Sequence, residues 1–176
     1  MTLERRRVLK LGGGIIATFS LPLSVRAASL EIIEMGGTAR GERIWFAPHG
    51  LAVSAGTTIR FVNRDPGNSH TATAYHPELF DRTRRIPKAA GPWDSGFLLP
   101  GESFEVTLEI PGVYDYYCIP HEMAAMVGRI VVGNPSDPRW EGSSPDTGDV
   151  SAKVLAALPR VEDILAKGRI GREDDI

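Results

Sequence analysis

Apolar and polar residues alternate in two stretches in the middle of the chain. Residues 57–63 read T-T-I-R-F-V-N, and residues 103–110 read S-F-E-V-T-L-E-I. Both stretches are rich in β-branched and aromatic residues, and a period of two places alternate side chains on a buried face and on a solvent face. Each stretch is therefore predicted to be a β-strand.

Shorter apolar runs, separated by Gly and Pro, add further predicted strands. They cover residues 29–35, 43–46, 50–53, 70–75, 113–117 and 128–132. Residues 76–93 show no clear period and carry four basic residues, so a long loop is expected there. Strand runs at regular spacing with almost no helical pattern indicate an all-β fold, either a sandwich or a barrel, in one domain over residues 28–133.

The character of the chain changes after position 133. Residues 134–149 are polar and rich in Pro, Gly and Ser, which predicts a linker. In residues 150–176, apolar positions recur at helical spacing on both sides of Pro159, which predicts two short helices at 150–158 and 161–167. We expect this helical tail to pack back on the sandwich.

The first 27 residues have the pattern of an export signal. A basic R-R-R-V-L-K segment precedes a short, Gly-rich apolar stretch, and small residues follow at a cleavage position. The paired arginines resemble a twin-arginine signal, which predicts a periplasmic or other extracytoplasmic location. If the signal were retained, it would act as a membrane tether.

Charge narrows the range of partners. The net charge is −2 for the whole chain, and it is −6 without the first 27 residues, which hold five of the 20 basic and one of the 22 acidic residues. A mildly acidic domain is a poor candidate for nucleic-acid binding, which depends on neutralising phosphates. No nucleic-acid partner is expected.

A single cysteine, Cys118, stands in the string Y-C-I-P-H-E-M-A-A-M-V-G. It excludes an internal disulfide, and a bond to a metal would protect the thiol in an oxidising compartment. Cys118, His121 and Met126 have the spacing C-x2-H-x4-M, with Met123 as an alternative thioether in the same loop. Thiolate and thioether are soft ligands for copper(I), imidazole suits copper(II), and two His, one Cys and a weak axial Met make a blue-copper site.

The second histidine must come from elsewhere in the fold. His70 is the best candidate, because it follows the turn cluster D-P-G-N and begins a predicted strand, where its side chain can reach one end of the sandwich. Of the remaining histidines, His49 is expected to serve packing or the surface. His76 could hold a second metal with Glu78 or Asp81, but no third ligand is evident in the sequence, so no second site is expected.

With these motifs the chain resembles the cupredoxins, in particular their plastocyanin- and pseudoazurin-like single-domain branch. The resemblance covers residues 30–133 and is strongest at 57–70 and 111–133. It implies a Greek-key β-sandwich holding one copper ion that cycles between +1 and +2. By match of motif the metal ligands would be His70, Cys118, His121 and Met126. It also implies one-electron shuttling by a monomer between a donor and an acceptor protein, with His121 as the exit for electrons.

One departure from the family pattern concerns the residue after the upstream histidine. The family often has Asn there, where it ties the two ligand loops together, whereas this chain has Thr71. The Thr71 hydroxyl can act as a hydrogen-bond acceptor and donor, and it is expected to take over this link with a shorter reach.

Three other hypotheses compete with electron transfer: a fragment of a copper enzyme, a copper chaperone or store, and a sandwich without copper. A fragment of a copper oxidase or nitrite reductase would couple the site to a second copper, but Tyr117 and Ile119 flank Cys118 and one ligand set is present, so no enzyme is expected. The alternative is a periplasmic copper chaperone or storage protein, which would need an open, exchangeable site. A sandwich that has lost its copper is a third reading, and the full ligand set argues against it.

Overall fold

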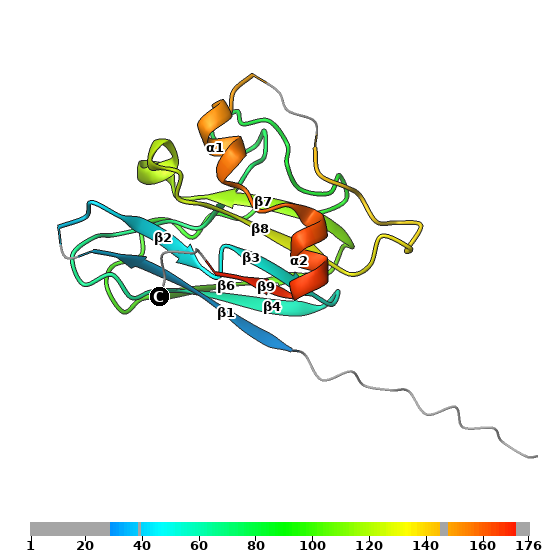
Figure 1. The fold of residues 1–176 in the computed structure, drawn as a ribbon, viewed down its shortest axis with the longest axis horizontal. Helices are drawn as coiled ribbons and strands as arrows, with labels where there is room; N and C mark the ends of the chain where they lie inside the picture. Colours follow the sequence, from blue (N-terminus) through cyan, green and yellow to red (C-terminus); the bar gives the residue numbers. More distant parts are fainter. Residues whose placement is uncertain (1–28, 39, 145–147, 172–176) are drawn as a thin grey trace, which may run out of the picture.

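The computed structural model describes residues 29–38, 40–144 and 148–171. Over these residues the chain forms two β-sheets that pack face to face, with two short helices lying over one of them (Figure 1). The predicted export signal in residues 1–27 lies outside the described residues. Within the described part of the chain, no helix has the length and apolar character needed to span a membrane.

The first sheet contains four strands in the order β2-β1-β4-β6. Their bounds are β1 Leu30–Gly37, β2 Ile44–Ala47, β4 Thr57–Asn63 and β6 Ser103–Leu108. β1 runs parallel to β4 and antiparallel to β2, and β4 is antiparallel to β6. Alternate residues of β4, such as Ile59 and Phe61, enter the core between the sheets, as the period of two in the sequence predicts.

The second sheet contains five strands in the order β5-β7-β8-β3-β9. Their bounds are β3 Gly50–Val53, β5 Thr73–Ala74, β7 Gly112–Tyr117, β8 Val127–Val132 and β9 Arg169–Ile170. Every residue of β7 and β8 is buried. Tyr114 and Tyr116 belong to the core between the sheets, whereas Tyr117 belongs to a separate apolar cluster on the opposite face.

The C-terminal helices cover that opposite face. α1 spans Ala152–Ala157 and α2 spans Val161–Lys167. Val154 of α1 packs in one cluster with Tyr117, and Ile164 of α2 packs in another with Val131. β9 then extends the sheet edge by pairing with β3. The expected all-β, Greek-key sandwich with a short helical tail is confirmed, and the tail forms a third layer.

The predicted strand at residues 70–75 is largely wrong. Only β5, Thr73–Ala74, is a strand there. His70 instead forms an isolated antiparallel bridge with Leu98, with N–H···O distances of 3.2 and 2.8 Å between the two residues. Leu98, the partner in this bridge, lies 28 positions along the chain from His70, so a local sequence pattern could not reveal the bridge. The consequence is that His70 is held at one end of the sandwich.

Candidate metal centre

The loop between β7 and β8 carries three of the four predicted ligands. Cys118 directly follows β7 in an extended conformation, and the 3-10 helix η1, Ile119–Ala124, begins with Pro120 in its first turn. The loop closes on itself through backbone bonds from the Cys118 N–H to the Met126 carbonyl at 3.0 Å and from the His121 N–H to the Cys118 carbonyl at 3.0 Å. Ala125 ends η1 in the left-handed region, with φ of 64°. This hydrogen-bonded loop fixes where Cys118 and His121 point.

A second loop, between β4 and β5, brings His70 to the same place. The Asp65 carboxylate accepts bonds from the backbone N–H groups of Gly67 and Asn68, which shapes the turn predicted from the D-P-G-N cluster. The Asn63 side-chain amide donates to the carbonyls of Asn68 and Leu98 at 2.8 and 2.9 Å. Asn63 is fully buried, so these bonds hold the loop from inside the protein.

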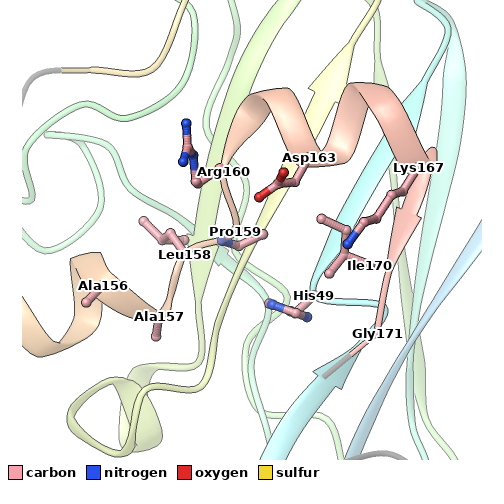
Figure 2. A pocket seen from close by; sticks show the side chains of 10 residues that line it. All are labelled: His49, Ala156, Ala157, Leu158, Pro159, Arg160, Asp163, Lys167, Ile170 and Gly171. Carbon is pink, nitrogen blue, oxygen red and sulfur yellow. The ribbon is translucent and has the colours of Figure 1, made fainter. Parts of the chain in front are cut away.

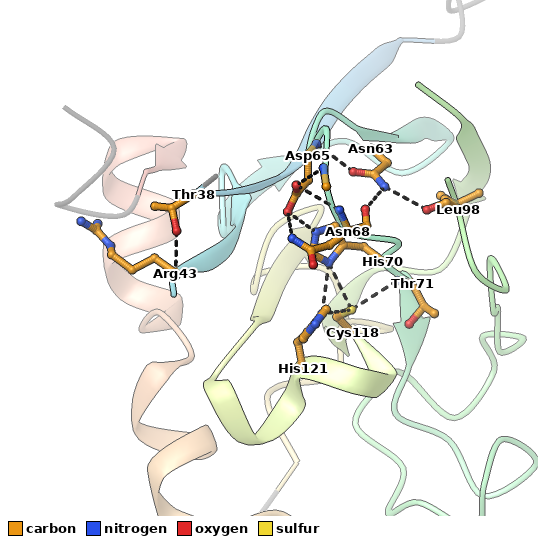
Figure 3. A network of polar contacts seen from close by, with 11 residues as sticks. Thr38, Arg43, Asn63, Asp65, Asn68, His70, Thr71, Leu98, Cys118 and His121 are labelled. Carbon is orange, nitrogen blue, oxygen red and sulfur yellow. Dashed lines mark hydrogen bonds and ion pairs between the residues drawn. The ribbon is translucent and has the colours of Figure 1, made fainter. Parts of the chain in front are cut away.

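The two loops bring His70, Cys118 and His121 together (Figure 3). The two Nδ1 atoms lie 3.2 Å apart, and Cys118 Sγ lies 3.4 Å from His121 Nδ1 and 3.7 Å from His70 Nδ1. Nitrogen and sulfur donors bound at about 2.0 to 2.3 Å in a trigonal plane lie about 3.5 to 3.7 Å from one another. The observed triangle therefore has nearly the size that a single metal ion requires.

The tautomer of His70 is set by Asp65. His70 Nε2 lies 3.0 Å from Asp65 Oδ2, and both side chains are buried. Burial alone would raise the pKa of Asp65, but hydrogen bonds from the Asn68 amide, the Gly67 N–H and His70 hold that pKa below its ordinary value. Because a carboxylate can only accept, Nε2 carries the proton and Nδ1 presents its lone pair to the other two ligands.

Sequence reasoning predicted the turn at Asp65 but no contact between Asp65 and His70. A carboxylate five residues before a candidate ligand histidine is a weak signal, because such a pair meets only if the intervening chain folds back. The Asx turn is what folds it back here, through the bonds from Gly67 and Asn68 to Asp65.

Thr71 links the two ligand loops, as expected from its position. Its hydroxyl accepts a bond from the Ile119 N–H at 2.8 Å, and its own backbone N–H points at Cys118 Sγ at 3.3 Å. A bond from the Thr73 hydroxyl at 3.0 Å holds the Thr71 hydroxyl in turn. Thr71 is fully buried, so this link is shielded from water.

Burial also sets the protonation of the ligands. It raises the pKa of the Cys118 thiol to about 11, although hydrogen bonds from Thr71 and His121 act in the opposite direction. Burial, which disfavours the charged imidazolium, lowers the pKa of His121. A cation bound here would have to displace the thiol proton, so metal binding and proton release are coupled.

The two methionines of the loop lie in different surroundings. Met126 is fully buried in the core cluster that contains Cys118, whereas the Met123 side chain is 67% exposed. His121 is partly exposed, while His70 and Cys118 are fully buried. Of these three residues, therefore, His121 alone is accessible to solvent.

Comparisons with known proteins agree with this arrangement. The sequence profile described as copper binding proteins, plastocyanin/azurin family, matches residues 33–133. The chain belongs to this family. Copper is accordingly its cofactor, and the cluster of two imidazoles and one thiol beside a buried thioether fits that ion.

Individual relatives are plastocyanins. The chain is 32% identical to chloroplastic plastocyanin of Chlamydomonas reinhardtii over 131 residues, which cover 72% of this chain and 82% of the relative. It is 33% identical to chloroplastic plastocyanin of Pisum sativum over 135 residues, covering 73% and 74%. Among solved structures, native pseudoazurin from Hyphomicrobium denitrificans aligns with a TM-score of 0.46 and 27% identity, covering 61% of this chain and 77% of that one.

Proposed function

We propose that this protein is a blue-copper electron carrier whose ligands are His70, Cys118, His121 and Met126. The observation that carries the proposal is the convergence of His70 Nδ1, His121 Nδ1 and Cys118 Sγ in a copper-binding family. Met126 is proposed as the axial ligand because its side chain is buried beside Cys118, whereas Met123 lies on the surface.

When bound, copper supplies one-electron chemistry by cycling between +1 and +2. The residues of this chain keep the ligands in one geometry during that cycle. Asp65 orients His70, and the hydrogen bond between Thr71 and Ile119 joins the two loops. A site that tolerates both oxidation states without rearrangement exchanges electrons readily.

His121 is proposed as the place where electrons enter or leave. Its ring is partly exposed, and Met123 and Ala124 beside it are exposed. An apolar surface at this point would let a redox partner approach the imidazole edge closely. The donor and the acceptor are proposed to be other redox proteins, and the carrier itself is proposed to act as a monomer.

Export is also part of the proposal. The basic and apolar pattern of residues 1–27 supports a twin-arginine-type signal and hence a periplasmic or other extracytoplasmic location. Strand runs support one domain over residues 28–133, and the polar, Pro-, Gly- and Ser-rich composition of residues 134–149 supports a linker.

A copper chaperone or storage protein is the alternative. Such a protein must release its metal to a partner, which favours exposed ligands. Here His70 and Cys118 are fully buried, Asp65 holds His70 in place and Thr71 ties the two loops together, which supports a retained ion. Apart from the copper ligands, we propose no catalytic groups, and we therefore do not propose that the protein is an enzyme.

The visible absorption spectrum of the copper(II) protein tests the proposal. An intense thiolate-to-copper band near about 600 nm is expected, and Cys118→Ser should abolish it. Met126→Leu should shift the reduction potential, while the matched change Met123→Leu should leave it unchanged. Absence of the band, or rapid loss of copper to a competing chelator, would favour the chaperone alternative.

A further inference from the structure

A buried ion cluster lies on the face of the second sheet that the helical tail covers. Asp115 of β7 is directly opposite Arg129 of β8 in the strand register. Its carboxylate accepts bonds from Arg129 Nε at 2.6 Å and Nη2 at 3.0 Å, and from Arg85 Nε at 2.9 Å. Asp115 is fully buried, and Arg85 and Arg129 are 3% and 8% exposed.

The charges of this cluster do not balance. Two guanidinium groups share one carboxylate, which leaves one buried positive charge in excess. Arg129 Nη1 donates to the Pro159 carbonyl at 2.9 Å, but Arg85 Nη1 is buried with no hydrogen-bond partner among the residues that the structure describes. An unpaired buried charge or donor is costly, so an additional negative group is expected nearby.

A cavity of about 460 Å³ lies beside the cluster, between the sheet and the tail. Three guanidinium side chains line it, those of Arg85, Arg129 and Arg160, together with Ser143 and Ser144. Its other lining residues are alanines and leucines, and no carboxylate is among the described residues that line it. The volume is within the range of small-molecule sites in proteins.

A neighbouring cavity differs in having a carboxylate in its lining. Figure 2 shows that cavity, where Asp163 lies among the basic side chains of Arg160 and Lys167. Arg160 stands between the two cavities, and in Figure 2 its side chain points away from His49.

We propose that the cavity lined by Arg85, Arg129 and Arg160 binds a small phosphate-class oxyanion. Guanidinium groups match the paired oxygens of such anions, and the Ser143 hydroxyl can donate a further hydrogen bond, whereas the Ser144 hydroxyl already donates to the Arg84 carbonyl at 2.8 Å. The site is composite, because Arg85 and Arg129 lie within the family-matched region 33–133, whereas both serines and Arg160 follow it. Anion binding therefore stabilises the docking of the tail on the sheet, independently of the copper site.

Phosphate titration of the full copper-loaded chain tests this proposal. Inorganic phosphate should raise the thermal midpoint saturably, above the effect of chloride at equal ionic strength, and should shift the Arg85 Nε–H resonance in NMR spectra of the reduced protein. Arg160→Gln should weaken phosphate binding by about tenfold or more, because a charged hydrogen bond is lost. Arg160 is 77% exposed, so this change should leave the fold intact.

Arg139→Gln is the matched control, since its side chain is 74% exposed and does not line the cavity. It should bind phosphate like the unchanged protein. Glycerol 3-phosphate distinguishes the source: tighter binding than inorganic phosphate assigns a phosphate ester, and equal or weaker binding assigns the free ion. Stabilisation no greater than by chloride, or an equal response of the Arg160→Gln and Arg139→Gln proteins, overturns the proposal.

Discussion

At the level of single residues, the candidate copper site depends on buried polar side chains that are not themselves ligands. Asp65, Asn63 and Thr71 are at most 1% exposed, and each makes hydrogen bonds that place a ligand loop. Gly37 on β1 has a related role, because a Cβ atom there would collide with the Asp65 carboxylate. Such contacts orient ligands and tune the metal, and removing them commonly weakens binding.

Asp65→Asn should weaken copper binding by about 10- to 100-fold. It should also raise the reduction potential, because the lost negative charge had favoured copper(II). Competition with a copper chelator measures the affinity, and voltammetry measures the potential. Asp137→Asn, which changes a surface carboxylate paired with Arg139, serves as the control. An unchanged potential in Asp65→Asn would contradict the role assigned to this carboxylate.

At the level of elements, the loop at residues 76–93 and the tail brace the outer side of the site. Arg82 of this loop bonds Glu122 of η1 at 2.6 Å and Asp149 at 3.1 Å. Its guanidinium also lies 5.1 and 5.0 Å from the ring centres of Tyr75 and Tyr117, which stack on each other. One of the four basic residues in the 76–93 loop is thereby explained, because Arg82 ties the ligand loop to the end of the predicted linker.

The tail contributes to stability through its buried side. Ile164→Ala should lower the free energy of unfolding by about 2 to 5 kcal/mol, because Ile164 is fully buried against the sheet. The adjacent change Leu165→Ala should cost less than about 1 kcal/mol, since Leu165 is 38% exposed. Urea unfolding measures both. Equal costs would show that the tail does not dock as described.

Asp149, the last residue of the predicted linker, makes the contact with the 76–93 loop sensitive to acid. Burial alone would raise the pKa of Asp149, but bonds from the Thr83 hydroxyl and N–H and from Arg82 hold it at about 2, below the ordinary value of 3.8. The stability that this group provides is therefore complete above about pH 4 and is lost as pH falls toward 2. Urea midpoints from pH 2 to 6 should show a weaker acid dependence in Asp149→Asn. Parallel curves for the two proteins would refute this.

At the level of the whole molecule, folding assembles the site from distant parts of the chain. His70 and Cys118 are 48 positions apart, and Thr71 and Ile119 bond across the same separation. An ion that binds all of these groups together binds the folded chain in preference to the unfolded chain. Copper and the fold therefore stabilise each other.

Copper removal should lower the free energy of unfolding. The loss should be about 4 kcal/mol relative to protein with free copper at 1,000 times its Kd. Denaturant unfolding with and without a strong chelator measures it. In Cys118→Ser the chelator should have little effect, and a full effect there would indicate that copper binds at another position.

The sequence was sufficient where the cause is local. The alternation in β4 and β6 comes from one face being buried, and the donor types and spacing of Cys118, His121 and Met126 come from one short loop, so both can be read along the chain. The assignment of Met126 as ligand stays a prediction. The His70 bridge to Leu98, the bond from His70 to Asp65 and the place where the tail docks, beside Tyr117 of β7, were not readable in this way. They join residues that chain folding brings together, and tertiary contacts with favourable burial and hydrogen bonding outweigh local strand propensity.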